Sequence, residues 1–327
     1  MADIVLVLAS SHSPALCMEP PAWVARVNDD KTLRQLIDTR GRTVDYAELL
    51  AAASPAIAAE IAPEKLAARH AQNQHAVAAT KAALAAAKPD VLIMIGDDHG
   101  EAYPADNMPA LAVYDGETIP YRPNKITTWP YAPALKSALW YGTEPKAYPV
   151  AAALARRLVA DLVEAGFETH RSHTYAPGVS MSHAFAFVYH RLMPAPPIPT
   201  IPIHINTYFP PNQITPARCV ELGRTLRTIV AGWDPKQRVA ILGSGGLSHF
   251  VVDEAMDRAF LDALARRDVQ AMTGIPRAKL DSGNSELRAW MAAAGAAEPL
   301  AMRLIDYVPC YRSPAGTGCG MAFATWN

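Results

Sequence analysis

Short apolar runs recur along the chain, without the strict alternation of apolar and polar residues that marks a half-exposed strand. They lie at residues 3–9, 90–96, 198–206 and 238–244. Continuous apolar runs of this length are typical of strands covered on both faces of a sheet. The pattern therefore predicts buried strands at these places.

Helical periodicity fills the intervals between these runs. The segments lie at residues 64–88, 150–165, 215–231 and 253–272. In the second of them, Leu154, Leu158 and Leu162 fall on one stripe. Strands that alternate with helices predict the α/β class, with a central, mostly parallel sheet flanked by helices.

The chain is expected to form a single domain over residues 1–327, because no repeat or low-complexity linker divides it. Two segments, residues 17–54 and 104–149, are long and irregular in pattern. Long connections of this kind often serve as lids or binding loops. We therefore expect them to cover a substrate site.

Charge and cysteine content narrow the range of partners. Lys plus Arg (30) nearly balance Asp plus Glu (31), without long runs of one sign. This balance argues against nucleic acid or a membrane as partner and suits a small neutral or anionic ligand. The four cysteines lack zinc-type spacing, and the N-terminal apolar run is too short for a signal peptide. A soluble, reduced, cytoplasmic protein is expected.

Histidines follow three of the predicted strands. They are His12 in "SSHSPAL", His99 in "IGDDHGE" and His249 in "GSGGLSHF". Ligands of open α/β sheets bind beyond the carboxyl ends of the strands, so these imidazoles are expected to meet in one cleft. Any one of them alone would more often be an ordinary hydrogen-bonded turn residue. The three together favour a site.

Two further residues are candidates, each with an ordinary structural explanation. His183 in "GVSMSHAFAF" could equally be a helix-start residue. Glu286 in "LDSGNSELRAW" begins a predicted helix with Asn284 or Ser285 as its cap, where the helix dipole alone favours an acid. Two imidazoles and one carboxylate are the ligands typical of non-haem Fe(II) oxygenases. By contrast, His204 lies mid-strand and is expected to be a packed, hydrogen-bonded core residue.

Taken together, "SSHSPAL", "IGDDHGEAY", "VSMSHAFAF", "GSGGLSHF" and "DSGNSELRAWMAAAG" resemble the class III extradiol ring-cleaving dioxygenases, the superfamily of the protocatechuate 4,5-dioxygenase β-subunit. The resemblance implies that His12, His99 and Glu286 bind Fe(II). It also implies that His249 is the acid/base residue and His183 a second active-site histidine.

The segment "PPAWVARVNDDK" and the helix before "KPDVLIMIGDDH" resemble the single-chain methylgallate branch of that superfamily. This resemblance implies O₂ and a catecholic, lignin-derived acid of the 3-O-methylgallate, gallate or protocatechuate type as substrates. Arg122, Arg171 and Arg312 are candidates to hold the acid, and the sequence does not rank them. "MSHAF" lacks the aspartate that often precedes the histidine in relatives, which leaves the orientation of His183 open.

Other functions fit the same residues. The reaction could act on a catecholic biphenyl, an aminophenol or a dihydroxypyridine. A zinc hydrolase would use the same ligands to activate water, and a non-catalytic relative would keep the fold as a binding module. The apolar, Pro-rich "MPAPPIPTIP" and the Trp-containing loops favour a homodimer.

Overall fold

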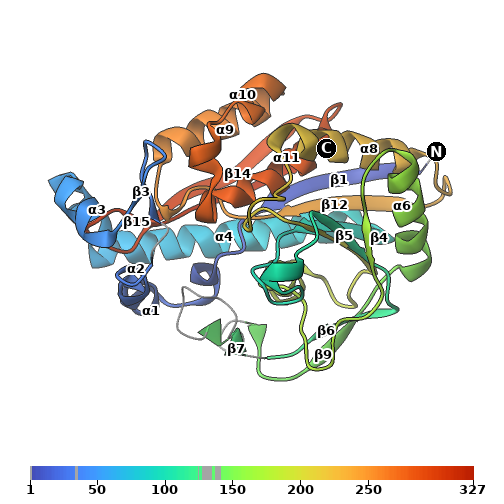
Figure 1. Ribbon diagram of the computed structural model, residues 1–327, viewed down its shortest axis with the longest axis horizontal. Coiled ribbons are helices and arrows are strands. Elements are labelled where there is room, and N and C mark those ends of the chain that lie inside the picture. The colour runs from blue at the N-terminus through green and yellow to red at the C-terminus, as the bar shows by residue number, and fades with distance from the viewer. Residues whose placement is uncertain (1, 34–35, 124, 127–134, 137–140) are drawn as a thin grey trace.

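The structure, a computed structural model, describes residues 2–33, 36–123, 125–126, 135–136 and 141–327 (Figure 1). Within this part of the chain a nine-stranded sheet forms the centre of the fold. In spatial order its strands are β10 (His170–Ser172), β5 (Leu111–Tyr114), β11 (Thr200–Ile205), β4 (Val91–Gly96), β12 (Arg238–Ser244), β1 (Asp3–Ser10), β15 (Thr317–Trp326) and β13 (His249–Val251), with β14 (Met302–Tyr311) also paired to β15.

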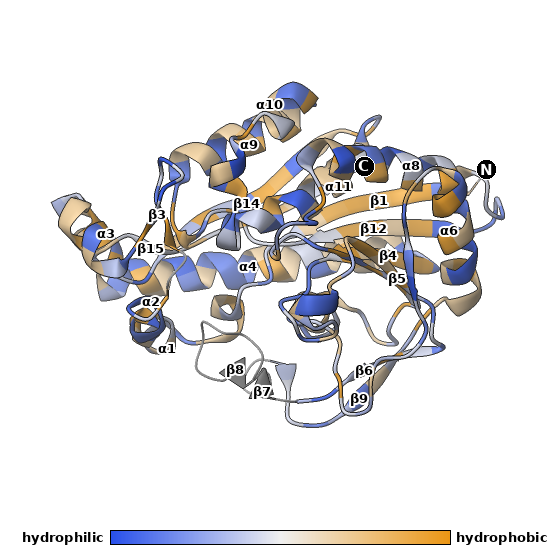
Figure 2. Ribbon diagram, viewed as in Figure 1, coloured by the Kyte–Doolittle hydropathy of each residue, from blue (hydrophilic) through white to orange (hydrophobic). Residues whose placement is uncertain are grey.

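Parallel pairing joins the four central strands, β11, β4, β12 and β1, while β15 runs antiparallel to β1, and β5 antiparallel to β11. The four predicted strands are these four central ones. Figure 2 shows β1, β12 and β4 as neighbouring hydrophobic strands. Their continuous apolar sequences therefore reflect burial on both faces, as predicted.

Helices cover the sheet on both sides. They are α1 (Pro20–Ala25), α2 (Val27–Asp30), α3 (Tyr46–Ala52), α4 (Pro63–Ala87), α6 (Ala152–Glu164), α7 (His183–Phe187), α8 (Pro216–Ala231), α9 (Glu254–Arg266), α10 (Val269–Thr273) and α11 (Leu287–Ala297). A Cβ on Gly243 of β12 would meet α11, whereas a Cβ on Gly96 of β4 would meet α7. Gly243 pairs with Ile95, so these two glycines face opposite sides of the sheet. The predicted fold class, a single α/β domain with a sheet flanked by helices, is confirmed.

The remaining elements are short. Short 3₁₀ or π helices lie at Pro14–Cys17, Pro55–Ile61, Ala105–Asn107, Val188–Leu192, Arg277–Leu280 and Ser282–Glu286. Two-stranded ribbons pair β2 (Leu36–Ile37) with β3 (Thr43–Val44), β6 (Thr118–Tyr121) with β9 (Lys146–Pro149), and β7 (Lys125–Ile126) with β8 (Leu135–Lys136). The segment 17–54 contains α1, α2, α3 and the β2–β3 ribbon, joined by turns, and part of the segment 104–149 lies outside the described residues.

Two local expectations differ from the structure. Residues 253–272, predicted as one helix, form α9 and α10, because Arg267 adopts a left-handed conformation (φ 58°) between them. The long antiparallel hairpin of β14 and β15 was not predicted. Its sequence contains Pro309 and the glycine-rich "GTGCG", which are poor strand formers, and pairing with β1 compensates for them.

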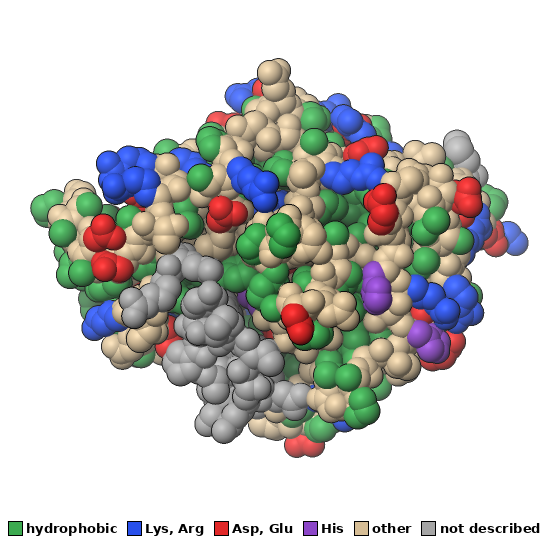
Figure 3. All heavy atoms as spheres, in the orientation of Figure 1, with side chains coloured by type: hydrophobic (Ala, Val, Ile, Leu, Met, Phe, Trp, Pro, Cys, Tyr) green, Lys and Arg blue, Asp and Glu red, His purple; other side chains and the backbone are tan. Residues whose placement is uncertain are grey.

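Surface charge agrees with the composition. Figure 3 shows basic and acidic side chains interspersed over one face of the molecule. Among the described residues, the helices are all too short or too polar to cross a lipid bilayer.

Candidate functional site

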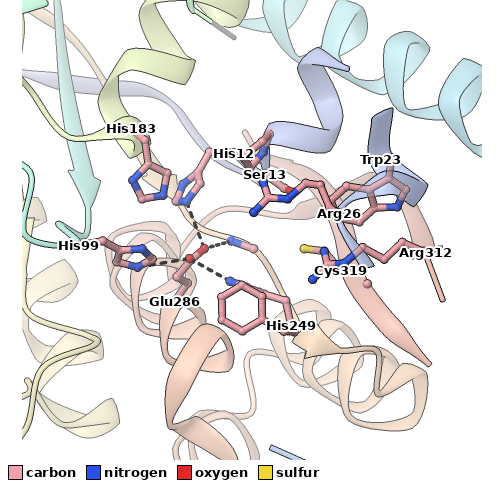
Figure 4. Close-up of a pocket in the computed structure, with 14 residues that line it drawn as sticks. His12, Ser13, Trp23, Arg26, His99, His183, His249, Glu286, Arg312 and Cys319 are labelled. Carbon is pink, nitrogen blue, oxygen red and sulfur yellow. Dashed lines mark hydrogen bonds and ion pairs between the residues drawn. The ribbon is translucent and has the colours of Figure 1, made fainter. Parts of the chain in front are cut away.

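All five predicted site residues line one pocket (Figure 4). It lies at the carboxyl ends of the central strands, where the open-sheet rule places ligands. The predicted residues are His12, His99, His183, His249 and Glu286, and all five are buried. Segments from five distant parts of the sequence therefore meet at this point.

His12 follows β1, and its ring is oriented by the neighbouring strand. The Ser244 hydroxyl donates to the Ala184 carbonyl (2.9 Å) and lies 3.0 Å from His12 Nδ1. Because the hydroxyl proton is already used in the hydrogen bond to Ala184, Ser244 Oγ acts as the acceptor and His12 Nδ1–H as the donor. The lone pair of the His12 ring is then on Nε2.

The Nε2 atom of His12 faces a carboxylate. It lies 3.2 Å from Glu286 Oε2 and makes no hydrogen bond with any of the described residues. A lone pair aimed at a carboxylate oxygen is repulsive unless a positive charge, either a proton or a metal ion, lies between them. This pair therefore fits a cation that both residues share.

Glu286 stands where a 3₁₀ turn passes into α11, and it is buried. Burial by itself would raise the pKa of Glu286, but His249 and His12 hold it well below the ordinary value. Its Oε2 accepts the Gly246 N–H at 2.5 Å. The predicted caps are wrong: Glu286 itself occupies the N-cap position, and the Asn284 side chain accepts the His249 N–H instead.

Asp97, which the sequence reasoning missed, joins this group. One ligand atom from each of His12, Asp97, His183 and Glu286 can be chosen so that all lie within 4.8 Å of one another. His99 lies just outside that set: its Nε2 is 2.7 Å from Asp97 Oδ2 and 3.8 Å from Glu286 Oε1. Burial and Glu286 would raise the pKa of Asp97, yet His99 and His12 lower it. In the sequence, the acidic run "GDDH" at the end of β4 could have indicated Asp97 as a candidate ligand.

His183 begins α7 and is held by a second missed acid, Glu101. Both the backbone N–H (3.0 Å) and Nδ1 (2.9 Å) of His183 contact Glu101 Oε1. Burial would lower the pKa of His183, but the buried Glu101 carboxylate raises it to about 10. Glu101 thus supplies the orienting contact that the absent aspartate left open. "DDHGE" already placed this acid two residues from His99.

His249 is enclosed by backbone on two sides. Its Nδ1 lies 2.8 Å from the Leu247 carbonyl, and its Nε2 lies 2.9 Å from Glu286 Oε1. Burial would lower the pKa of His249, but Glu286 raises it well above the ordinary value. A Cβ on Gly283 would overlap the imidazole, and one on Gly246 would come within 2.8 Å of it. The glycines of "GSGG" and "DSGN" therefore let the backbone pack directly against this ring.

The three candidate arginines differ in whether they line the pocket. Arg312 lines the pocket, while Arg122 and Arg171 are not among its described lining residues, and Arg171 pairs with Asp115 (2.8 Å) instead. Arg26, which the sequence reasoning did not consider, also lines the pocket.

Fold and site together define a single-domain α/β protein with a buried group of carboxylates and imidazoles that could hold a metal ion. A family model described as the catalytic LigB subunit of aromatic ring-opening dioxygenase matches residues 49–315. The chain belongs to this family, the class III extradiol dioxygenases, and is therefore an oxidoreductase that opens aromatic rings. The predicted family is confirmed. The match includes four of the five site residues and begins after His12.

Proposed function

We propose that this protein is an Fe(II)-dependent extradiol dioxygenase that uses O₂ to open the ring of a catecholic, lignin-derived acid of the 3-O-methylgallate, gallate or protocatechuate type. The observation that carries the proposal is the buried pair of His12 Nε2 and Glu286 Oε2, 3.2 Å apart, which fits a cation shared by the two residues. Family membership supports ring opening as the reaction of this site.

His12 and Glu286 would hold the iron, together with His99 as the resemblance implies. Two imidazoles and a carboxylate leave open positions for reactants, as in other non-haem ferrous oxygenases. Asp97 lies close enough to serve as an additional or alternative ligand. When bound, Fe(II) supplies the redox capacity for reaction with O₂ and the positive charge that favours a deprotonated diol.

His249 is proposed to move a proton at Nε2. The Leu247 carbonyl accepts from Nδ1–H and so keeps that proton in place. Nε2, which faces the ligand group, is then the atom that exchanges a proton with the diol. Because Glu286 raises the pKa of His249, Nε2 would act as a base only once a metal ion on Glu286 offsets that negative charge. The glycine contacts hold the ring in this orientation.

His183 is proposed to stabilise negative charge that develops on the substrate. Its Nδ1 is held by Glu101, and its ring centroid lies 4.7 Å from that of His12 and 4.8 Å from that of His99. A protonated imidazole fixed by a buried carboxylate provides an oriented donor next to the ligand group.

Alternative functions carry less support. Membership of a ring-opening dioxygenase family favours an oxygenase over a zinc hydrolase or a non-catalytic binding module. The same reaction on a catecholic biphenyl, an aminophenol or a dihydroxypyridine stays an alternative for the substrate.

The decisive experiment is anaerobic reconstitution with Fe(II), followed by oxygen-electrode assays over a panel of catecholic acids and the alternative substrates. We expect oxygen uptake with a coloured ring-fission product from the acids, and loss of both with Glu286→Gln. If the iron-loaded protein consumes no oxygen with any substrate, the proposal is wrong.

We also propose that the protein is a cytoplasmic homodimer. Much of the Pro-rich segment that suggested a dimer is buried or half-buried within the chain, with Ala195, Pro196 and Pro199 exposed. Light scattering coupled to size exclusion would determine the oligomeric state.

A further inference from the structure

The pocket has a basic end that the proposed reaction does not use. Arg26 and Arg312 both line it, beside Trp23. In Figure 4 these three side chains lie at the opposite end from His99 and His183, with His12 and Glu286 closer to the histidines. The pocket therefore has a metal-binding end and a cationic end, with apolar residues such as Phe250 and Pro14 also in its wall.

The guanidinium of Arg312 is held in a buried ion pair with Asp30. Its Nε lies 2.7 Å from Asp30 Oδ2, and its second nitrogen bonds the other oxygen of the same carboxylate. Asp30 is fully buried and also accepts from Thr317 Oγ1 at 2.5 Å. Arg312 further packs over Trp23, with 4.6 Å between the guanidinium carbon and the ring centroid. It therefore anchors α2 to the C-terminal hairpin and contributes charge to the pocket.

Arg26 is placed differently. It stands at the junction of α1 and α2, with a side chain that is 13% exposed and an Nε 3.2 Å from Asp29 Oδ2. Burial and repulsion from Arg312 together lower the pKa of Arg26 to about 10, although Asp29 and Asp30 act in the opposite direction. Arg26 stays cationic at neutral pH, and the Arg312 cation lines the same pocket. An anion entering the pocket would relieve that repulsion.

We propose that Arg26 binds the carboxylate of the substrate and selects acidic over neutral catechols. The inference rests on the proposed ring-opening function, because the diol is then directed to the Glu286 end of the same pocket. A planar guanidinium matches a carboxylate with two parallel hydrogen bonds. An aromatic acid places its diol and its carboxylate on opposite sides of one ring, as the two ends of this pocket require.

The test compares two catechols that differ in one ring substituent, a carboxylate in protocatechuate and a methyl group in 4-methylcatechol. Protocatechuate and 4-methylcatechol bind to the Fe(II)-loaded protein under anaerobic titration calorimetry, which needs no turnover. Arg26→Met is expected to weaken protocatechuate binding by roughly ten- to a hundred-fold, the usual range for a charged hydrogen bond, and 4-methylcatechol by less than about threefold. Arg26→Lys keeps the charge without the planar fork and should give a smaller, acid-specific loss.

Arg171→Met is the matched control. Arg171 is exposed, pairs with Asp115 outside the pocket, and leaves Asp115 with Arg156 and His173 as partners. It should bind both ligands as the wild type does. If Arg26→Met is not folded by circular dichroism, Arg26→Lys carries the comparison.

Failure of this inference is distinct from failure of the proposed function. If the Arg26 variants weaken both ligands equally, or neither, Arg26 is not the anchor, whatever the oxygen electrode shows. If the wild type binds protocatechuate through Arg26 but consumes no oxygen, the anchor stands as a binding site and the proposed reaction is wrong.

Discussion

His12 Nδ1 lies 3.0 Å from Ser244 Oγ, a contact that joins the carboxyl ends of the parallel strands β1 and β12. The Ser244 hydroxyl donates a hydrogen bond to the Ala184 carbonyl, so its oxygen accepts from His12 Nδ1–H, and the contact fixes both the tautomer and the direction of the ring. Hydrogen bonds of this kind orient the histidines that bind metals. The site thus depends on a residue that never touches the proposed ion.

Ser244→Ala is expected to weaken metal binding by roughly ten- to a hundred-fold, the usual cost of removing such an orienting partner. Competition with a chelator measures the affinity. Ser10→Ala is the matched control, because Ser10 pairs with Ser244 in register but its hydroxyl donates to the Ser11 carbonyl. Equal affinities in the two variants would contradict the role assigned to Ser244.

The ligand set can be decided by metal content. Asp97→Asn and His99→Asn each remove one candidate ligand while keeping a polar side chain of similar size. If the family resemblance identifies the ligands correctly, His99→Asn loses iron and Asp97→Asn keeps most of it; the reverse result would favour the compact group that contains Asp97. Elemental analysis of both variants after anaerobic loading distinguishes the two sets.

His249→Ala is expected to lower turnover by roughly a hundred- to ten-thousand-fold, the usual contribution of a general acid–base group, while iron stays bound. Steady-state oxygen consumption and metal analysis on the same preparation separate the two effects. Full activity in this variant would remove His249 from the reaction.

Gly283→Ala tests the backbone enclosure of that ring. A methyl group at this position would overlap the His249 side chain and its carbonyl, so the ring must move or the turn must open. We expect a loss of activity comparable to that of His249→Ala, together with a lower melting temperature. Gly232→Ala, where the nearest atom to the new Cβ would be 3.3 Å away at the end of α8, should change neither.

The buried imidazole of His204 is expected to make the folded protein less stable in acid. Burial lowers its pKa from 6.5 to about 3 in the folded protein. Below pH 6.5, His204 takes up a proton in the unfolded chain but stays neutral in the folded protein. The free energy of unfolding therefore falls as the pH drops from 6.5 towards 3. This residue alone should lower the free energy of unfolding by about 2 kcal/mol between pH 7 and pH 5.

Denaturant titrations at the two pH values measure this effect. His204→Phe fits beside Phe185 and Tyr103 and cannot titrate, although Tyr175 loses its hydrogen-bond partner. The variant should start from a lower stability and show a weaker pH dependence than the wild type. An unchanged pH dependence would mean that His204 does not titrate on unfolding.

Local patterns were sufficient to predict the centre of the fold. Apolar runs and helical stripes depend on neighbours within a few residues, so β1, β4, β11, β12 and α4 were recognisable from the chain alone. The C-terminal hairpin was not, because its Gly- and Pro-containing strands are stabilised by pairing with each other and with β1. The intrinsic strand propensity of a segment does not reveal a strand that is stabilised by pairing with residues distant in the sequence.

The candidate site divides in the same way. Sequence alone determined which side chains could carry the chemistry: histidines after strands, one carboxylate in a glycine-containing turn, and motifs in the order of one enzyme family. Only the tertiary structure decided that Glu101 orients His183, that Asp97 joins the ligand group, and that Arg26 rather than Arg171 faces the pocket. Those assignments depend on distances of a few ångströms between atoms from separate segments, and folding alone brings such segments together.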